Sequence, residues 1–194
     1  MTVDEEKKRM RDHGRLIRQE AAGRNTKVFA DRAKKNFLNG LSDMNILANS
    51  VFAGYWPLPG EVDIRPLLEG LDAQGHVLAL PVVVEEGHRL AFRRWRPGLK
   101  LEGGLHGTLH PGSGEEEVRP DVVFIPLISF DLSGYRLGQG GGYYDRTLES
   151  LRAGGDLLAV GFAWEAQRVD AVPRNAYDQR LDWIITEENA HGIS

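Results

Sequence analysis

Long apolar runs alternate with amphipathic segments along the chain, and the runs predict strands that are covered on both faces. We expect such strands at 77–84 (VLALPVVV), 121–130 (DVVFIPLISF) and 157–164 (LLAVGFAW). Uninterrupted apolar runs of this length are typical of parallel sheets with helices on both sides. Three further strands are expected where the apolar runs are shorter, at 49–56, 90–95 and 181–187.

The spacing of apolar residues that is typical of a helix is clearest just before the strand expected at 49–56. In residues 26–47, Phe29, Ala33, Phe37 and Leu41 recur every four positions, which predicts one buried helix face. A short helix is expected through Leu67, Leu68 and Leu71, capped by Asp63 or a neighbour, and another begins near Tyr143. Residues 97–120 read as a long loop. Strands that alternate with helices predict an α/β sandwich with a mostly parallel sheet.

Residues 5–23 predict a helix of a different kind. Its apolar stripe, Met10, Ile17 and Ala21, is too narrow to bury a helix strongly. Gly14 weakens it by about 1 kcal/mol relative to alanine. Between Lys7 and Arg18 it carries six basic residues and one acid. We therefore expect this helix to be held by something else, such as an anionic ligand; a solvated basic face and a nucleic-acid contact are the alternatives.

Composition narrows the class of protein. With 194 residues, one domain spanning 1–194 is expected, since a domain has about 150 residues. The chain has no cysteine, which excludes a disulfide framework, a thiolate nucleophile and cysteine-bound metals. A net charge of −4 disfavours a general nucleic-acid binder. No apolar run is long enough for a membrane helix, and the N-terminal segment MTVDEEKKRMRDHG has no apolar run that a secretory signal would need. We therefore expect no membrane partner and a cytoplasmic location.

Glycine is the residue type that stands out. It makes up 23 of 194 residues, and five glycines lie in SGYRLGQGGGYYDR (133–146), after a buried strand and before a helix. At the carboxyl end of a strand, such glycines let backbone N–H groups approach phosphate oxygens closely. The loop is neither a Walker A motif nor a Rossmann fingerprint. A phosphate cradle of another type is favoured over a flexible turn without a ligand.

Asp145 lies at the junction of this loop and the following helix. A carboxylate beside phosphates is unfavourable unless a cation lies between them, which predicts a Mg²⁺ ligand. The alternative is an acid in the first turn of a helix, where the helix dipole stabilises it.

At this loop the chain resembles a known family. RLGQGGGYYDR (136–146) resembles the RLGxGGGYYDR signature of 5-formyltetrahydrofolate cyclo-ligase, also called 5,10-methenyltetrahydrofolate synthetase. The likeness extends over nearly the whole chain. The supporting segments are KKRMR (7–11), YWPLPGEVDIRPLL (55–68), FRRWRPG (92–98), PDVVFIPLISFD (120–131) and DAVPRNAYDQRLDWIITE (170–187).

The resemblance implies a fold and a reaction. The fold is a three-layer α/β/α sandwich similar to the ribose-5-phosphate isomerase type. In the reaction, ATP phosphorylates the formyl oxygen of 5-formyltetrahydrofolate, N10 attacks the activated carbon, and phosphate leaves as the 5,10-methenyl bridge closes. Mg²⁺ is the implied cofactor and ATP the co-substrate. The expected partners are these small molecules, and we expect a monomer or a weak homo-oligomer.

The resemblance also implies roles for individual residues. Arg136, Tyr143 and Asp145 are the implied catalytic residues, and Asp145 and Asp178 the implied metal ligands. Folate is expected at Tyr55, Leu58, Glu61, Asp63, Trp95 and Tyr143. ATP is expected at Lys7, Lys8, Arg9, Met10 and Arg11 of the first helix and at Arg136, Leu137, Gly138, Gln139, Gly140, Gly141, Gly142, Tyr143 and Tyr144.

Two segments depart from the family pattern. Where family members often have P-x-E-x-H-D, residues 173–178 read PRNAYD, which keeps the Asp as Asp178 but has neither the Glu nor the His. Where G-I-x-E-P is frequent, residues 107–111 read GTLHP, so His110 replaces the acid. These departures leave open a catalytically impaired paralogue that binds nucleotide or folate without turnover.

Overall fold

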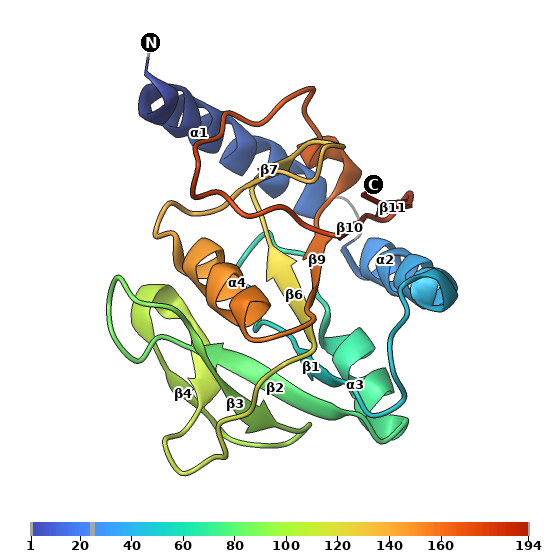
Figure 1. The fold of residues 1–194 in the computed structure, drawn as a ribbon. Helices are drawn as coiled ribbons and strands as arrows, with labels where there is room; N and C mark the ends of the chain where they lie inside the picture. The colour runs from blue at the N-terminus through green and yellow to red at the C-terminus, as the bar shows by residue number, and fades with distance from the viewer. Residues whose placement is uncertain (1, 24–25, 194) are drawn as a thin grey trace.

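The computed structural model describes residues 2–23 and 26–193. Its central sheet has seven strands in the order β11-β10-β9-β6-β1-β2-β3 (Figure 1). The five inner strands are parallel, and the two edge strands, β3 and β11, are antiparallel to their neighbours. The bounds are β1 Val51–Ala53, β2 Val77–Val82, β3 Ala91–Trp95, β6 Val122–Pro126, β9 Leu158–Phe162, β10 Trp183–Ile185 and β11 Ala190–Gly192.

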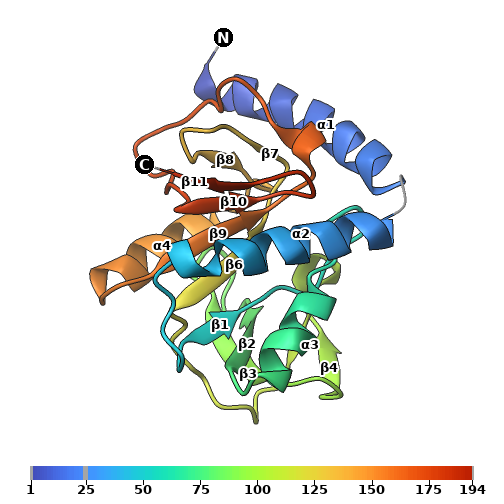
Figure 2. The same ribbon diagram turned by 90° about the vertical axis from the view of Figure 1, so that its right-hand side faces the viewer.

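Helices cover both faces of this sheet. α2 and α3 lie on one face and α4 on the other, while α1 crosses the top of the molecule (Figures 1 and 2). The predicted α/β/α sandwich is therefore confirmed. The helices are α1 Val3–Ala22, α2 Thr26–Gly40, α3 Arg65–Ala73 and α4 Tyr143–Ala153, with 3₁₀ turns η1 Leu41–Asp43, η2 Leu105–Gly107 and η3 Glu165–Gln167.

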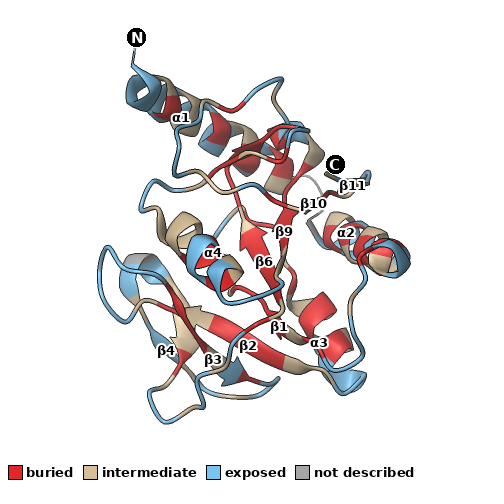
Figure 3. Ribbon diagram, in the orientation of Figure 1, coloured by how far each residue is buried: buried red, intermediate tan, exposed pale blue. Residues whose placement is uncertain are grey.

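Two apolar layers hold the sheet between the helices, because neighbouring strand residues point to opposite faces. In β6, Phe124 packs with the α2–α3 layer, whereas Val123 and Ile125 pack with the α4 layer. In β1, Phe52 and Ala53 divide in the same way. Figure 3 shows the buried residues concentrated along these strands and on the inner sides of the helices.

Several predicted boundaries were wrong. The strand expected at 121–130 is two strands: β6 stops at Pro126, which has no N–H to donate to a sheet, and β7 (Ser129–Phe130) pairs with β8 (Arg136–Leu137) instead. The loop expected at 97–120 contains a hairpin of β4 (Leu101–Gly103) and β5 (Leu109–Pro111).

The other errors concern the ends of elements. The helix expected at 26–47 ends at Gly40 and tightens into η1, after which Asn45 adopts a positive φ of 51°. The strand expected at 49–56 spans only Val51–Ala53. The strand expected last, at 181–187, is followed by β11, whose three residues are too few to show a periodicity. The cap of α3 agrees with the expectation of Asp63 or a neighbour: it is Ile64, and the Asp63 carboxylate accepts the N–H of Arg65 at 3.0 Å.

The buried face of α1 is not the predicted apolar stripe. Its buried residues are Lys7, Gly14, Arg18 and Ala21, while Met10 and Ile17 are only half-buried. Gly14 lies so close to the segment before β7 that a Cβ there would stand 2.6 Å from Ile128 Cγ2 and 2.7 Å from Ser129 Oγ. The glycine expected to weaken the helix is therefore what lets it approach the rest of the protein.

Candidate active site

The topology brings two predicted ligand segments to one edge of the sheet. β1 and β6 are parallel neighbours, so their carboxyl ends lie side by side. From β1 the chain passes through residues 54–64 to α3 and β2, while from β6 it passes through the glycine loop to α4 and β9 on the other side. Ligands of open α/β sheets bind where the strand order diverges in this way.

The glycine loop has a defined shape at the start of α4. Gly140 and Gly142 have φ values of 110° and 65°, which residues with a side chain rarely adopt. A Cβ on Gly141 would stand 2.8 Å from the Tyr143 ring, and Arg146 Nη2 donates to the Gly141 carbonyl oxygen at 2.7 Å. These constraints favour the phosphate cradle over the flexible turn, since the loop leads directly into the N-terminus of a helix.

Helix α1 presents basic side chains to this loop. Arg11 Nε donates to the Gly138 carbonyl oxygen at 3.0 Å, and Arg15 Nη2 reaches Gln139 Oε1 at 3.4 Å. Lys7 Nζ lies 2.5 Å and 2.8 Å from the two carboxylate oxygens of Asp178. Residues four apart share one helical face, which is why these three side chains point the same way. Lys8 and Arg9, also predicted to bind ATP, are exposed.

A buried arginine connects the loop to the segment before β10. The side chain of Arg136 is 4% exposed, and its Nη2 donates to Asp145 Oδ1 at 2.9 Å. Arg136 Nη1 donates to the Gln179 carbonyl oxygen, and the Gln179 N–H donates to Asp145 Oδ1 at 3.0 Å. Burial lowers the pKa of Arg136, while the charges of Asp145 and Asp178 act in the opposite direction. Both predicted metal ligands therefore lie near one guanidinium.

These two carboxylates fit a magnesium ion in donor type. Both are hard oxygen donors, and Mg²⁺ in nucleotide sites is commonly held by one or two carboxylates, the phosphates and water. Both hydrogen bonds to Asp145 fall on Oδ1, which leaves Oδ2 for another partner. Within residues 2–23 and 26–193, no three His, Cys, Asp or Glu side chains are grouped as a metal site.

The charges at this edge do not cancel. Lys7 is paired with Asp178 and Arg136 with Asp145. Arg11 instead donates to a neutral carbonyl oxygen, and no carboxylate of the described residues forms an ion pair with it. The excess of positive charge beside a helix N-terminus favours an anionic ligand.

The predicted folate segment folds around a buried carboxylate. Glu61 Oε1 lies 3.1 Å from Arg18 Nη1, and Glu61 Oε2 accepts the Leu58 N–H at 2.9 Å. Tyr55 donates its hydroxyl to the Val62 carbonyl oxygen at 2.8 Å. Burial raises the pKa of Glu61, against the opposing effects of the Leu58 N–H and Arg18.

Tyr144 links this segment to the glycine loop. Burial raises the pKa of Tyr144, and the charge of Glu61 raises it further. An electrostatic effect of this kind requires the two side chains to be near each other. The start of α4, the folate segment and α1 therefore meet at the same edge of the sheet.

Two predicted folate residues are placed differently. Asp63 forms two hydrogen bonds with the Arg65 side chain, at 2.6 and 2.8 Å, and Arg65 lies 5.2 Å from the Trp56 ring. Trp95 pairs with Leu78 near the N-terminus of β2. The glycine loop lies at the opposite, carboxyl end of the parallel strands. Trp95 packs 6.2 Å from Trp56 and lines a cavity of about 300 Å³ together with His76.

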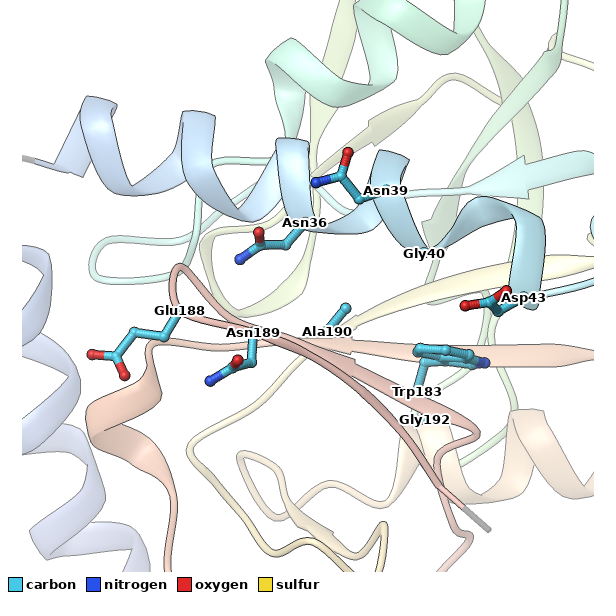
Figure 4. A pocket seen from close by; sticks show the side chains of 9 residues that line it. All are labelled: Asn36, Asn39, Gly40, Asp43, Trp183, Glu188, Asn189, Ala190 and Gly192. Carbon is cyan, nitrogen blue, oxygen red and sulfur yellow. The ribbon is translucent and has the colours of Figure 1, made fainter.

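A cavity of about 350 Å³ lies elsewhere, between α2 and the β10–β11 pair (Figure 4). Gly40, Trp183 and Gly192 form part of its wall, and Asn36 donates to the Thr186 carbonyl oxygen at 2.9 Å. None of the predicted site residues lines this cavity. It is therefore separate from the glycine-loop site.

Sequence reasoning missed two residues of this site. Gln179 contributes its backbone to Arg136 and Asp145, a role that no side-chain pattern could indicate. The sequence marks Arg18 only as part of a basic run. Its spacing held a usable signal, since Lys7, Arg11, Gly14 and Arg18 follow the three- and four-residue spacing of one helix face.

Comparison with known proteins agrees with this geometry. The profile of the 5-formyltetrahydrofolate cyclo-ligase family matches residues 3–187. The chain belongs to this family. The 5-formyltetrahydrofolate cyclo-ligase of Haemophilus influenzae is 33% identical over 136 residues, 68% of this chain and 72% of that protein. The Escherichia coli K12 enzyme of the same name is 33% identical over 146 residues, 73% and 79% of the two chains.

Solved structures support the family fold. The NMR structure of Aquifex aeolicus 5,10-methenyltetrahydrofolate synthetase superimposes with a TM-score of 0.75 at 29% identity, covering 96% of this chain and 92% of that one. The Mycoplasma pneumoniae synthetase, at 22% identity and a TM-score of 0.72, shares the fold. The family predicted from the glycine signature is thus confirmed. No helix in the described part of the chain has the length and apolarity to cross a membrane.

Proposed function

We propose that this protein converts 5-formyltetrahydrofolate to 5,10-methenyltetrahydrofolate with cleavage of ATP to ADP and phosphate. Family membership supports the ligase reaction. The observation that carries the proposal is the convergence of α1, the glycine loop and the Glu61 segment at the carboxyl ends of β1 and β6. One edge of the sheet then offers both a phosphate site and a buried carboxylate for a ring with N–H donors.

The reaction proceeds in two steps. The formyl oxygen attacks the γ-phosphorus of ATP, and ADP leaves with the bond electrons. N10 then attacks the activated formyl carbon and loses its proton, and the C–O bond breaks to release phosphate as the five-membered ring closes. Phosphoryl transfer depends mainly on positioning and charge stabilisation, which this chain can supply through Lys7, Arg11 and Arg136. The backbone N–H groups of residues 138–142 would hold further phosphate oxygens.

Asp145 and Asp178 would hold the Mg²⁺ ion. When bound, the ion would neutralise phosphate charge next to these carboxylates. Lys7 and Arg136, which are paired with the two carboxylates in this structure, would then be available to the phosphates. Exchange of ion-pair partners on ATP binding is therefore part of the proposal.

Folate would bind at Glu61, Tyr55, Leu58 and Tyr143. A carboxylate matches the paired N–H donors of a pterin ring, and an aromatic side chain offers a stacking surface. Asp63 and Trp95 are weaker members of this set, because one is paired with Arg65 and the other lies at the far end of β3.

A direct assay tests the proposal against the impaired paralogue. Protein, ATP, Mg²⁺ and 5-formyltetrahydrofolate are mixed, and the near-ultraviolet absorbance of the methenyl product is followed. We expect steady formation of product that requires both ATP and Mg²⁺. Folate binding without any product would instead identify the impaired paralogue, which the altered 173–178 segment would then explain.

The Asp145→Asn variant tests the metal assignment. We expect turnover to be abolished while folate binding survives, because the variant removes a charge that Mg²⁺ needs and leaves the Glu61 segment intact. Turnover and folate binding are measured separately, the second by equilibrium titration without ATP. Activity within about threefold of wild type would refute the assignment, since loss of a required positioning group costs about a hundredfold or more.

The expectations of a cytoplasmic location and of a monomer or weak homo-oligomer stay predictions, as does the likeness to ribose-5-phosphate isomerase. The nucleic-acid interpretation of α1 also has its own test. It requires steeply salt-dependent binding to any duplex. Docking of the helix's basic face on the glycine loop, at Gly138 and Gln139, supports the small-molecule interpretation instead.

A further inference from the structure

We infer that Arg18 is a positioning residue for the folate substrate: from α1 it orients the Glu61 carboxylate and stabilises its negative charge. The inference rests on the proposed function, because it takes Glu61 as the carboxylate that receives the substrate ring. Arg18 is not one of the residues that the family signatures mark, since the N-terminal signature ends at Arg11.

Arg18 and Glu61 form a buried ion pair. The side chains of Arg18 and Glu61 are 10% and 5% exposed, and the Nη1–Oε1 distance is 3.1 Å. Glu61 Oε2 accepts the Leu58 N–H at 2.9 Å. Each carboxylate oxygen therefore has one fixed donor from the protein. A carboxylate has about four lone-pair positions, so each oxygen keeps a position for an N–H donor of a ligand.

The turn that carries Glu61 is held on both sides. Gly60 has a φ of 88°, and a Cβ there would lie 3.6 Å from Arg18 Nε. The Gly60 carbonyl oxygen accepts Trp164 Nε1–H at 2.9 Å. The turn thus packs on Arg18 from one direction and is tied by Trp164 from another. The backbone of this turn is therefore fixed, and the direction of the Glu61 side chain is set by its contact with Arg18.

The charges around Glu61 give Arg18 its second role. Arg18 is the cation that opposes the effect of burial on the pKa of Glu61. The other titratable groups that interact with Glu61 are Tyr55 on the same segment and Tyr144 on α4, and burial raises the pKa of both. Neither tyrosine supplies a positive charge. Without Arg18, burial would raise the pKa of Glu61 further.

Arg18 also explains why one helix serves two substrates. Lys7, Arg11 and Arg18 lie on one face of α1, and the eleven helical steps from Lys7 to Arg18 span about 16 Å. Lys7 and Arg11 lie at the proposed phosphate site, and Arg18 lies at the folate segment. A single rigid helix therefore fixes the distance between the two binding sites.

Kinetics of the Arg18→Met and Arg18→Lys variants test the inference. For Arg18→Met we expect the KM for 5-formyltetrahydrofolate to rise about tenfold or more, the loss of one charge-assisted contact, with the KM for ATP changed less than about twofold. The acidic limb of the pH profile of kcat/KM for folate should move to higher pH, because removal of Arg18 raises the pKa of Glu61. Arg18→Lys should restore part of both effects.

Two controls separate positioning from general stability. Arg119→Met removes an arginine that ties the segment before β6 to the end of α4, by hydrogen bonds to the Leu151 and Asp156 carbonyl oxygens, far from the folate segment. It should leave both KM values and the pH profile unchanged. In a Glu61→Gln background, Arg18→Met should have little further effect on the KM for folate. Equal changes in both KM values without a pH shift, as a merely structural role would give, would overturn the inference.

A measurement without turnover keeps the two proposals distinguishable. The Glu61 carboxyl carbon is titrated by ¹³C NMR in wild type and in Arg18→Met. A higher pKa in the variant supports the inference, and an unchanged value overturns it. Wild-type protein that neither turns over nor binds folate would refute the proposed function, while the NMR titration would still decide whether Arg18 stabilises the negative charge of Glu61.

Discussion

The first two helices are consecutive in sequence, yet they are attached to the protein in opposite ways. α2 buries Ala33 and Phe37, and Phe37 packs 5.1 Å from Phe124 and 6.0 Å from Phe162. α1 buries one apolar side chain, Ala21, in the core; its other buried residues, Lys7, Gly14 and Arg18, form ion pairs or a close backbone approach.

This difference in attachment corresponds to a difference in the role of each helix. Apolar packing is strong, non-directional and independent of ligand, so it suits a helix that only covers the sheet. Ion pairs and hydrogen bonds hold side chains in defined directions, and a charged ligand can exchange with them. The helix that would bind ATP and align folate is attached by contacts that such ligands can use.

The largest expected effect comes from breaking the apolar attachment of α2. Phe37→Ala should lower the free energy of unfolding by about 3–5 kcal/mol, because it removes a fully buried ring and leaves a cavity. Chemical denaturation measures the loss, and kcat per folded molecule should stay within about twofold of wild type. Lys35→Ala, on the exposed side of the same helix, should change stability by about 0.5 kcal/mol at most. A loss below about 1 kcal/mol for Phe37→Ala would contradict the comparison.

The next effect concerns the close approach of α1. Gly14→Ala adds a Cβ that would lie 2.6 Å from Ile128 Cγ2, so the helix must move away. Overpacking costs about 1–3 kcal/mol, against a gain of about 1 kcal/mol in helix propensity. We expect a net loss of up to about 2 kcal/mol in stability and a clear rise in the KM for ATP. His13→Ala is the matched control, since His13 is exposed on the same turn. A more stable and fully active Gly14→Ala protein would show that the contact does not matter.

The smallest effect tests an ion pair outside α1. Burial raises the pKa of Asp63, but the hydrogen bonds and the charge of Arg65 together outweigh burial, so the pKa is lowered. A carboxyl group with a lowered pKa in the folded protein adds stability at pH values above its ordinary pKa of 3.8. This stability is lost as the pH falls through the pKa of the folded protein. Because both side chains are partly exposed, Asp63→Asn should cost less than about 1 kcal/mol at pH 7.

The pH dependence gives this last prediction its test. The difference in Tm between wild type and Asp63→Asn should shrink as the pH falls from about 3.8, where the unfolded carboxylate takes up a proton, through the lower pKa of Asp63 in the folded protein. Asp12→Asn, which removes the exposed Asp12–Arg15 pair, serves as the control for a surface pair at pH 7 and should leave Tm nearly unchanged. A Tm difference that grows on acidification would show that the sign of the Asp63 shift is wrong.

The sequence by itself determined the class of fold, the order of the main elements and the family. These follow from local patterns: apolar runs predict buried strands, the spacing of Phe29, Ala33 and Phe37 predicts α2, and RLGQGGGYYDR marks the family. Such patterns are readable because a strand or helix repeats its geometry every two or about four residues. The short strands β4, β5 and β11 have too few residues to show any period.

Only the tertiary structure decided how the site is assembled. Lys7 and Asp178 are 171 residues apart, Arg11 and Gly138 are 127 apart, and Arg18 and Glu61 are 43 apart. No local period links such positions; they meet because β1 and β6 are neighbours whose connections leave in opposite directions. The same packing turned Gly14 from a weakness of an isolated helix into the residue that lets α1 dock. The basic stripe was visible in the sequence, but its partners exist only in the folded protein.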